Sequence, residues 1–354
     1  MKNKRIKLYK TVCLFLILSV ISGSVGRSLA EASPEKEVAT TEVGQDTVLV
    51  GGMQVGIYME TDGILVLDTQ KIENEEGNFC EPAHNLLHAG DYILEMNGAK
   101  VLDKDALIRE VEKLTSSEVR MKIKRNEELI EVKFDAVKTN EEEYKLGVWV
   151  RDNVQGLGTI TYLTQNSEFG ALGHGIHDVD ISSLIDISKG SLYKTNIGSI
   201  KKGENGNPGS MEGIIIYNSL NKIGTIYKNT EAGIYGELEN IEEVFTEKYA
   251  VEVAKAEEIK TGPAKIRCSL GDEIEEYDIE ILKVDLWQKE INKGIVINVT
   301  DEELLEKTGG IIQGMSGSPI LQDGKLIGAV THVFVNDPTK GYGIFIENML
   351  EAAG

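Results

Sequence analysis

Short strand-like runs separated by glycine-rich turns fill the chain from residue 148 to its end at residue 354. Apolar and β-branched residues dominate segments such as "GLGTITYL", "AKIRCSL", "GIVINV" and "LIGAVTHVFV". The chain has 37 glycines but only 6 prolines, which favours many turns over rigid linkers. Short strands at close spacing are typical of β-barrels and sandwiches. We therefore predict a mostly β fold, and the length allows two domains with separate cores.

The first 30 residues have the pattern of an export signal. A basic start, "MKNKRIKLYK", precedes an apolar stretch from Val12 to Ile21, which is shorter than the roughly 20 residues that cross a bilayer. Small residues then offer cleavage sites after Ala30 and after Ala32. An uncleaved membrane anchor is the alternative, and either interpretation places the rest of the chain outside the cytoplasm. The polar residues 31–46 are expected to form a flexible segment.

Charge and cysteine usage exclude several classes of function. The formal net charge of −21 repels phosphate backbones and anionic lipids, so nucleic acid is not an expected partner. No CxxC or HExxH motif occurs, so neither a metal nor another cofactor is expected. Beyond Cys13 in the signal segment, only Cys80 and Cys268 remain, and they form either a disulfide or two unpaired thiols.

Residues 47–137 have the pattern of one compact unit. Apolar runs, "TVLVGGMQVGIYM" and "GILVLDTQKI", precede a strand and a turn at Asn97-Gly98. A helix follows, with Asp103 or Asp105 as its N-cap. The segments "EVRMKIKRN" and "LIEVKFDAV" then alternate apolar and polar residues, as paired strands do.

This unit resembles a PDZ domain through "GGMQVGI", "HAGDYILEMNGAKV" and the helix that follows. In that family the glycine loop and the next strand bind a peptide as an additional strand of the sheet. The resemblance implies peptide contacts from Gly52, Val55, Gly56 and Ile57, with the helix from Asp105 as the other wall of the groove. The alternative is that the glycine loop only turns the chain.

Residues 138–147, "KTNEEEYKLG", are predicted to link this unit to a second domain spanning 148–354. Within that domain, "TDEELLEKTGG" predicts a helix. Thr300 is its expected N-cap, Glu303 occupies the capping-box position and Gly309 is its expected stop.

The segment "GIIQGMSGSP" places Ser316 among glycines, directly before a hairpin that turns at Asp323-Gly324. A serine hydroxyl becomes a nucleophile when a base takes its proton, and acyl transfer also needs N–H donors aimed at the developing oxyanion. The backbone N–H groups of Gly314 and Ser316 are the expected donors. The segment resembles the "GDSGGP" loop of trypsin-like serine proteases, although Met315 and Ser318 depart from that pattern. An ordinary turn is the alternative.

Five histidines are available as the base. His174 follows the apolar "FGAL" run, in a context similar to the base of trypsin-like enzymes. His332 lies in the apolar strand after the serine, where it is expected to be a core or pocket-wall residue. The others, His84, His88 and His177, have the surroundings of polar loop residues.

The chain order of these residues discriminates between enzyme scaffolds. A base that precedes the serine excludes the α/β-hydrolase order, and Ser318 breaks the GxSxG motif. The His–Asp–Ser order of trypsin-like enzymes fits. The residues leave the acid open: Asp186, the acids around Glu237 and Asp301 are all candidates. Asp301 opens the predicted helix, where an acid also favours the helix dipole.

Taken together, the export signal, the PDZ-like unit and the motifs "GALGH", "VTDEELLEKTGGIIQGMSGSPI" and "GAVTHVFVNDPTKGYGIFIE" closely resemble the stage IV sporulation protein B peptidase family of endospore-forming bacteria. The resemblance implies a trypsin-like double β-barrel peptidase domain. It also implies that Ser316 attacks, His174 transfers the proton and Asp301 orients the imidazole, with Gly314 and Ser316 holding the oxyanion.

The same resemblance implies a biological role. Members of the family are exported into the space between the two spore membranes, cleave themselves and then cut a membrane-anchored inhibitor of an intramembrane protease. A sporulation sigma factor precursor is then processed. The implied partners are this membrane-anchored substrate and a peptide ligand of the PDZ domain, including a segment of the chain itself. The alternatives are a non-catalytic exported PDZ adaptor and a quality-control protease of the HtrA type, in which the PDZ domain follows the protease.

Overall fold

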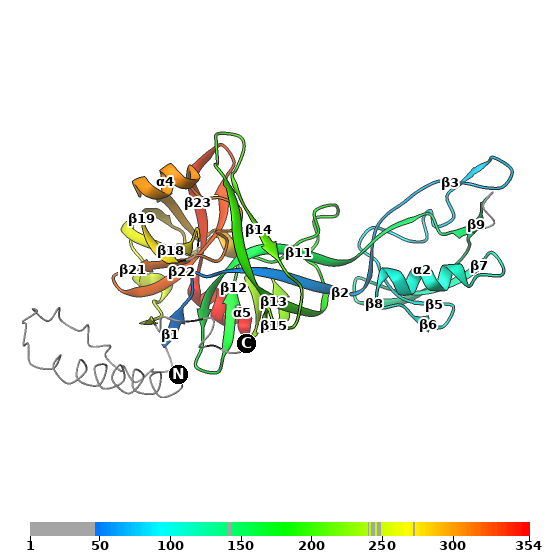
Figure 1. Ribbon diagram of the computed structural model, residues 1–354, viewed down its shortest axis with the longest axis horizontal. Helices are drawn as coiled ribbons and strands as arrows, with labels where there is room; N and C mark the ends of the chain where they lie inside the picture. Colours follow the sequence, from blue (N-terminus) through cyan, green and yellow to red (C-terminus); the bar gives the residue numbers. More distant parts are fainter. Residues whose placement is uncertain (1–46, 140–142, 240, 242–244, 246–248, 272) are drawn as a thin grey trace, which may run out of the picture. The chain divides into compact units, whose positions relative to one another are not determined.

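The computed structural model describes residues 47–354 except 140–142, 240, 242–244, 246–248 and 272 (Figure 1). The predicted signal segment and the polar residues 31–46 lie outside these residues. No helix in the described ranges is long and apolar enough to span a membrane.

The strands are β1 (Thr47–Val50), β2 (Gln54–Thr69), β3 (Ile72–Glu73), β4 (Phe79–Cys80), β5 (Tyr92–Met96), β6 (Ala99–Lys100), β7 (Glu118–Arg125), β8 (Glu128–Asp135), β9 (Val137–Lys138), β10 (Tyr144–Lys145), β11 (Val148–Leu163), β12 (Glu168–Ala171), β13 (Ile187–Lys201), β14 (Ser210–Ile215), β15 (Lys222–Thr230), β16 (Gly233–Leu238), β17 (Ala250–Glu252), β18 (Gly262–Ser269), β19 (Ile274–Val284), β20 (Ile295–Val299), β21 (Pro319–Gln322), β22 (Lys325–Phe334) and β23 (Asp337–Phe345). The helices are α2 (Lys104–Glu112), α4 (Glu302–Thr308) and α5 (Ile346–Ala353).

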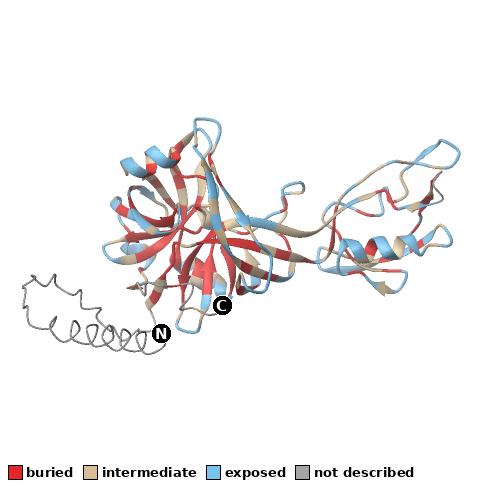
Figure 2. Ribbon diagram, in the orientation of Figure 1, coloured by how far each residue is buried: buried red, intermediate tan, exposed pale blue. Residues whose placement is uncertain are grey.

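Two β-barrels make up the larger part of the described chain. In the first, β11, β12, β16, β15, β13 and β2 pair in that order, and β2 pairs again with β11, so the ring is complete. In the second, β18, β19, β20, β23, β22 and β21 form a closed barrel. Buried residues follow the strands of both barrels (Figure 2). The prediction of a mostly β fold with a double barrel is confirmed.

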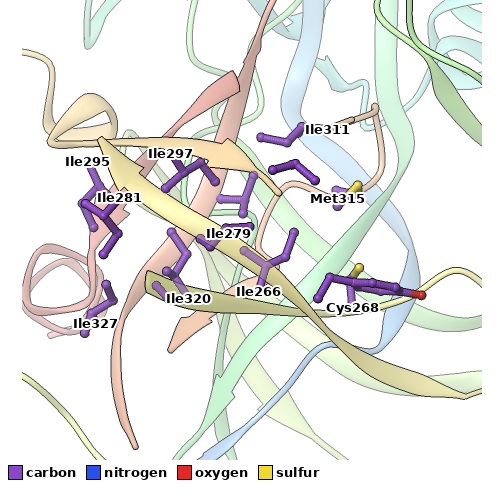
Figure 3. Close-up of a cluster of buried hydrophobic side chains, with 14 of the residues drawn as sticks. Ile266, Cys268, Ile279, Ile281, Ile295, Ile297, Ile311, Met315, Ile320 and Ile327 are labelled. Atoms are coloured by element: carbon purple, nitrogen blue, oxygen red, sulfur yellow. The ribbon is translucent and has the colours of Figure 1, made fainter. Parts of the chain in front are cut away.

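β-branched side chains fill the second barrel. Figure 3 shows isoleucines from several strands meeting in its interior, among them Ile266, Ile279 and Ile297, which are at most 2% exposed. Met315, from the segment that was predicted to carry the nucleophile, belongs to this same cluster and is fully buried. The backbone beside Ser316 is therefore anchored in the core of the second barrel.

A unit of about 90 residues interrupts the first barrel. β2 and β11 form one long antiparallel ladder, from Gln54 paired with Thr159 to Thr69 paired with Val148. The first half of β2 lies in the barrel, and its second half pairs with β5 at Ile64 and Leu65. The chain between β2 and β11 forms the sheet of β5, β7 and β8 together with α2. This part of the chain has its own hydrophobic cluster. We call residues 62–150 the inserted unit.

The inserted unit changes the place of the predicted peptide-binding residues. All four predicted residues precede the inserted unit. Gly52 lies just before β2, and the first half of β2 contains Val55, Gly56 and Ile57. That half is paired on both edges, for example Ile57 with Gly156 of β11 and with Leu192 of β13. Val55 and Ile57 are buried in the barrel core. No sheet edge is open there for a peptide, so the assignment of these four residues to a peptide groove is wrong.

The predicted domain boundary at residues 138–147 also needs correction. Residues 47–61 pair with β11, β13 and β17 and so belong to the barrel region, not to the N-terminal unit. The chain enters the inserted unit within one continuous strand, β2, and leaves it within another, β11. Polar residues, 60–63 in β2 and 151–153 in β11, lie at both crossings, but neither stretch ends its strand.

Several local predictions are confirmed. Asp103 caps α2 by accepting a hydrogen bond from the Ala106 N–H at 2.6 Å. Asn97 and Gly98 both have positive φ angles, 51° and 84°, as the predicted tight turn requires. Cys80 is exposed and Cys268 is buried, and both are free thiols, so the disulfide alternative is excluded.

Candidate active site

The segment that carries Ser316 is shaped by two glycines. Gly314 has a φ of 104° and Gly317 a φ of 93°, a region that side chains rarely adopt. A Cβ atom on Gly317 would lie 2.1 Å from the Thr159 carbonyl oxygen and 2.5 Å from the Leu172 nitrogen. These glycines allow the loop of the second barrel to contact the backbone of the first.

Ser316 is fixed between the two barrels. Its carbonyl accepts a hydrogen bond from the Thr159 N–H of β11 at 2.9 Å. Its Oγ donates to the Thr331 carbonyl of β22 at 2.9 Å. The next residue, Gly317, donates its N–H to the Val330 carbonyl at 2.8 Å. The hydroxyl therefore lies where the walls of both barrels meet, and it is partly exposed.

The two predicted oxyanion donors are unoccupied. Among the described residues, neither the Gly314 N–H nor the Ser316 N–H donates to a protein acceptor, although the N–H groups of Gln313, Met315, Gly317 and Ser318 all do. The Gly314 peptide is held by its carbonyl, which accepts from the Thr159 hydroxyl at 3.0 Å. An oxyanion hole is built from backbone N–H donors that no protein acceptor occupies, and these two meet that requirement.

His174 follows β12 through two residues with positive φ angles, Leu172 and Gly173. Its Nδ1 lies 2.9 Å from the Gly175 carbonyl oxygen, which can only accept. We therefore assign the proton to Nδ1, which leaves Nε2 as the basic nitrogen. Burial lowers the pKa of His174 below its usual 6.5, and the charge of His177 lowers this pKa further. The ring is neutral at pH 7, as a general base must be.

His174 lies against a second histidine, His332, on the strand that also accepts the Ser316 hydroxyl bond. The His174 and His332 rings have centroids 4.9 Å apart. His332 directly follows Thr331, the residue that accepts the Ser316 hydroxyl. Gly317, next to Ser316, packs closely against the Thr159 carbonyl and the Leu172 nitrogen. The Leu172 N–H donates to that same carbonyl, and Leu172 lies two residues before His174. No hydrogen bond joins Ser316 to His174 in this state, in which the Oγ proton is directed to Thr331.

The structure places Asp301 at the start of α4, and its assignment as the acid of the triad stays a prediction. One carboxylate oxygen caps α4 by accepting from the Leu304 N–H at 2.9 Å, and the other accepts from the Asp278 N–H at 3.3 Å. Asp301, and not Thr300, is thus the N-cap, while Gly309 ends the helix as predicted. No hydrogen bond or ion pair joins this carboxylate to His174.

The other acids that the sequence left open are also occupied elsewhere. Asp186 pairs with Lys124 of the inserted unit at 3.1 Å, and Glu237 accepts from the Tyr227 hydroxyl at 3.3 Å. The carboxylate whose charge acts on the pKa of His174 is Glu231, which bonds the His177 ring at 3.2 Å. Across the described residues, the direct partner of His174 Nδ1 is a backbone carbonyl.

Two functional positions were missed by reasoning from the sequence. Thr159 and Thr331 contact the backbone of the nucleophile segment or its hydroxyl, but they are ordinary β-branched residues within strand-like runs. Their partners are 15 or more residues away in sequence, so no local pattern could have revealed them.

Comparisons with known proteins give one family match and several distant structural likenesses. Residues 142–350 match the model of a family described as SpoIVB peptidase S55. No curated protein matches the chain. Among solved structures, the Rv3671c protease of M. tuberculosis in its inactive form is 10% identical, with a TM-score of 0.29, over 56% of this chain and 82% of that chain. The HtrA-type protease AlgW with a decapeptide is 9% identical, with a TM-score of 0.33, over 85% of this chain and 62% of that chain. At these identities and TM-scores, neither likeness supports a conclusion about this chain.

The family match, in contrast, includes both His174 and Ser316 and extends over more than half of the 354 residues. The chain therefore belongs to the SpoIVB peptidase S55 family and is a serine peptidase.

Proposed function

We propose that this peptidase is an exported endopeptidase of endospore formation. It cleaves itself and then a membrane-anchored inhibitory protein, which activates the intramembrane processing of a sporulation sigma factor precursor. Membership of the family supports the reaction class. The sporulation role rests on the sequence resemblance to that family, and export rests on the signal-like pattern of the first 30 residues.

In the proposed reaction His174 is the general base and Ser316 the nucleophile. When a substrate is bound, the Ser316 hydroxyl leaves the Thr331 carbonyl and gives its proton to His174 Nε2. Oγ attacks the scissile carbonyl carbon, and the new oxyanion accepts from the Gly314 and Ser316 N–H groups. His174 then gives the proton to the leaving amine, and water hydrolyses the acyl-enzyme by the same steps.

The Gly175 carbonyl replaces the carboxylate of a conventional triad in this account. It accepts from His174 Nδ1–H at 2.9 Å and so selects the tautomer with a basic Nε2. A carbonyl dipole stabilises the imidazolium less than a carboxylate would. The structure thus supports a Ser316–His174 dyad more directly than a triad with Asp301.

One observation carries the proposal above all others: in the described part of the chain, the serine at the junction of two barrels has a free N–H of its own and another two residues earlier, on Gly314, on the segment that packs beside the strand end before His174. A non-catalytic adaptor has no need for this arrangement. The proposed partners are the membrane-anchored protein substrate and a peptide ligand of the inserted unit.

Replacement of the chromosomal Ser316 codon by alanine in the organism that carries this gene tests the role. We expect Ser316→Ala to abolish both the shortened forms of the chain on an immunoblot and the formation of heat-resistant spores. Wild-type levels of both in that strain would exclude a peptidase role and favour the adaptor. A loss of self-cleavage with normal spore formation would exclude the sporulation role while leaving the peptidase intact.

A further inference from the structure

The loop that follows His174 is a small closed structure. Residues 176 and 185 come together through the Ile185 N–H and the Ile176 carbonyl at 3.1 Å, and His177 forms a β-bridge with Leu184. The Gly175 carbonyl that orients His174 is at the start of this loop. The direction of the base therefore depends on how residues 175–185 are held.

Asp178 organises the far end of this loop. Its carboxylate accepts from the backbone N–H groups of Asp180 at 2.9 Å and Ile181 at 3.2 Å. Its side chain is fully buried. A buried carboxylate is costly unless a cation compensates its charge.

Arg151 of β11 supplies that cation. One guanidinium nitrogen, Nη1, donates to the Asp178 carboxylate, and the other, Nη2, donates to Asp180 at 2.7 Å. The fork of the guanidinium thus holds two carboxylates of the same loop in a fixed relation. Lysine, with a single ammonium group, cannot reproduce this geometry in full.

The position of Arg151 links the loop to the inserted unit. Arg151 pairs with Leu65 in the half of β2 that also pairs with β5, whereas Asn153, two residues later, pairs with Glu60 in the barrel half. The side chain therefore leaves the ladder where the chain passes from the inserted unit back into the first barrel.

We propose that Arg151 is a positioning residue for the catalytic base: by holding Asp178 and Asp180 it fixes the loop whose Gly175 carbonyl orients His174. The inference rests on the proposed role of His174 as the base. If Arg151 has this role, the junction between the inserted unit and the first barrel helps to determine whether the site is catalytically competent. A displacement of β11 at residue 151 is transmitted to the base through this pair.

The test compares full-length variants by the rate at which a small fluorophosphonate labels Ser316, by kcat and KM on a peptide substrate, and by Tm. Arg151→Gln is expected to lower the labelling rate and kcat by about tenfold to hundredfold, with KM within about twofold of wild type, because the base is misplaced and the substrate site is not. Arg151→Lys retains contact with Asp178 and is expected to recover most of the labelling rate.

A matched control exists in the inserted unit. Asp91 is as buried as Asp178, and Arg125 donates to it from Nε at 2.6 Å and from Nη2 at 2.7 Å. Arg125→Gln is expected to lower Tm as Arg151→Gln does but to leave the labelling rate at the wild-type value.

Wild-type labelling in Arg151→Gln, or an equal loss in Arg125→Gln, would overturn the inference. Should Arg151→Gln fail to fold, Asp180→Ala removes only the exposed contact: a slower labelling rate supports the inference and an unchanged one overturns it. If wild type itself is not labelled, the proposed function fails first, and the role of Arg151 fails with it.

Discussion

The two loops that form the active site are held in different ways. Backbone hydrogen bonds join the nucleophile segment to its neighbours, from the Thr159 N–H to Ser316 and from Gly317 to Val330, with threonine hydroxyls as additional donors. The histidine loop closes on itself through backbone bonds, but side chains join it to neighbouring elements: Asn229 makes three bonds to its backbone, and Arg151 holds its carboxylates. Backbone bonds persist through most substitutions, whereas side-chain bonds are lost with one residue. We infer that the nucleophile is the constant part of this site and that the base is the part that can be adjusted.

The largest expected effect comes from breaking the close backbone contact of the nucleophile segment. Gly317→Ala places a Cβ 2.1 Å from the Thr159 carbonyl at a φ of 93°, so the barrels must move apart. We expect a loss of about 3 kcal/mol or more in the free energy of unfolding, with no labelling of Ser316. Denaturant unfolding measures this loss.

Gly324→Ala is the matched control for this substitution. Gly324 also has a positive φ, 78°, but no atom lies within 4 Å of the added Cβ. It is expected to cost only about 1 kcal/mol, with normal labelling. Equal costs at both positions would show that backbone strain, and not the contact between barrels, dominates.

The histidine loop is tested by Asn229→Ala. The Asn229 side chain accepts from the Ile176 N–H and donates to the carbonyls of Ile176 and Ile185, all at 2.9 Å. Its loss deprives the partly buried Ile176 N–H and Ile185 carbonyl of this partner, whereas the Ile176 carbonyl keeps its bond from the Ile185 N–H, so we expect about 2 kcal/mol of destabilisation and a labelling rate lowered several-fold.

Asn218→Ala provides the comparison. Asn218 accepts from the N–H groups of Leu220 and Asn221 in an exposed turn, where water can replace it. Thermal unfolding should change by less than about 1 kcal/mol there, and labelling should not change. A labelling rate that is the same in both variants would contradict the claim that side chains orient the base.

The same contrast explains what the sequence could predict. Local chemistry predicted the strands, the Asn97-Gly98 turn, the stop at Gly309 and the nucleophile segment, because each depends on residues next to one another. The histidine loop was not predicted, since Arg151 and Asp178 are 27 residues apart and Asn229 is 53 residues from Ile176. Nor was the inserted unit, because the polar residues 60–63 in the middle of β2 have the pattern of a turn within one domain, although the strand continues through them.

The geometry and the family resemblance assign different roles to Asp301: a helix cap in the first case and the acid of the triad in the second. As a helix cap it should be replaceable by asparagine, which caps equally well, so Asp301→Asn is expected to keep kcat within a few-fold of wild type. Asp301→Ala should cost about 1 kcal/mol of stability. If Asp301 orients the base, asparagine would instead lower kcat by about 10⁴-fold, and steady-state kinetics distinguishes the two outcomes.

The smallest expected effect concerns the pH dependence of stability. Burial, and then the charge of His174, lower the pKa of His332 from 6.5 to about 4. Between these values the unfolded chain binds more protons at this site than the folded chain, so stability falls as pH falls from about 6.5 to about 4. His332→Gln should therefore reduce the Tm difference between pH 7 and pH 5, and an unchanged difference would contradict the lowered pKa of His332.

The most direct test of the account is fluorophosphonate labelling of the full-length protein, followed by mass spectrometry, beside Ser316→Ala and His174→Ala. We predict a single adduct on Ser316 that is lost in both variants. Because burial lowers the pKa of His174, the labelling rate should fall on acidification with a midpoint below pH 6.5. Unchanged labelling in a folded His174→Ala, or no adduct in folded wild type, would contradict the central claim that these barrels assemble an activated serine.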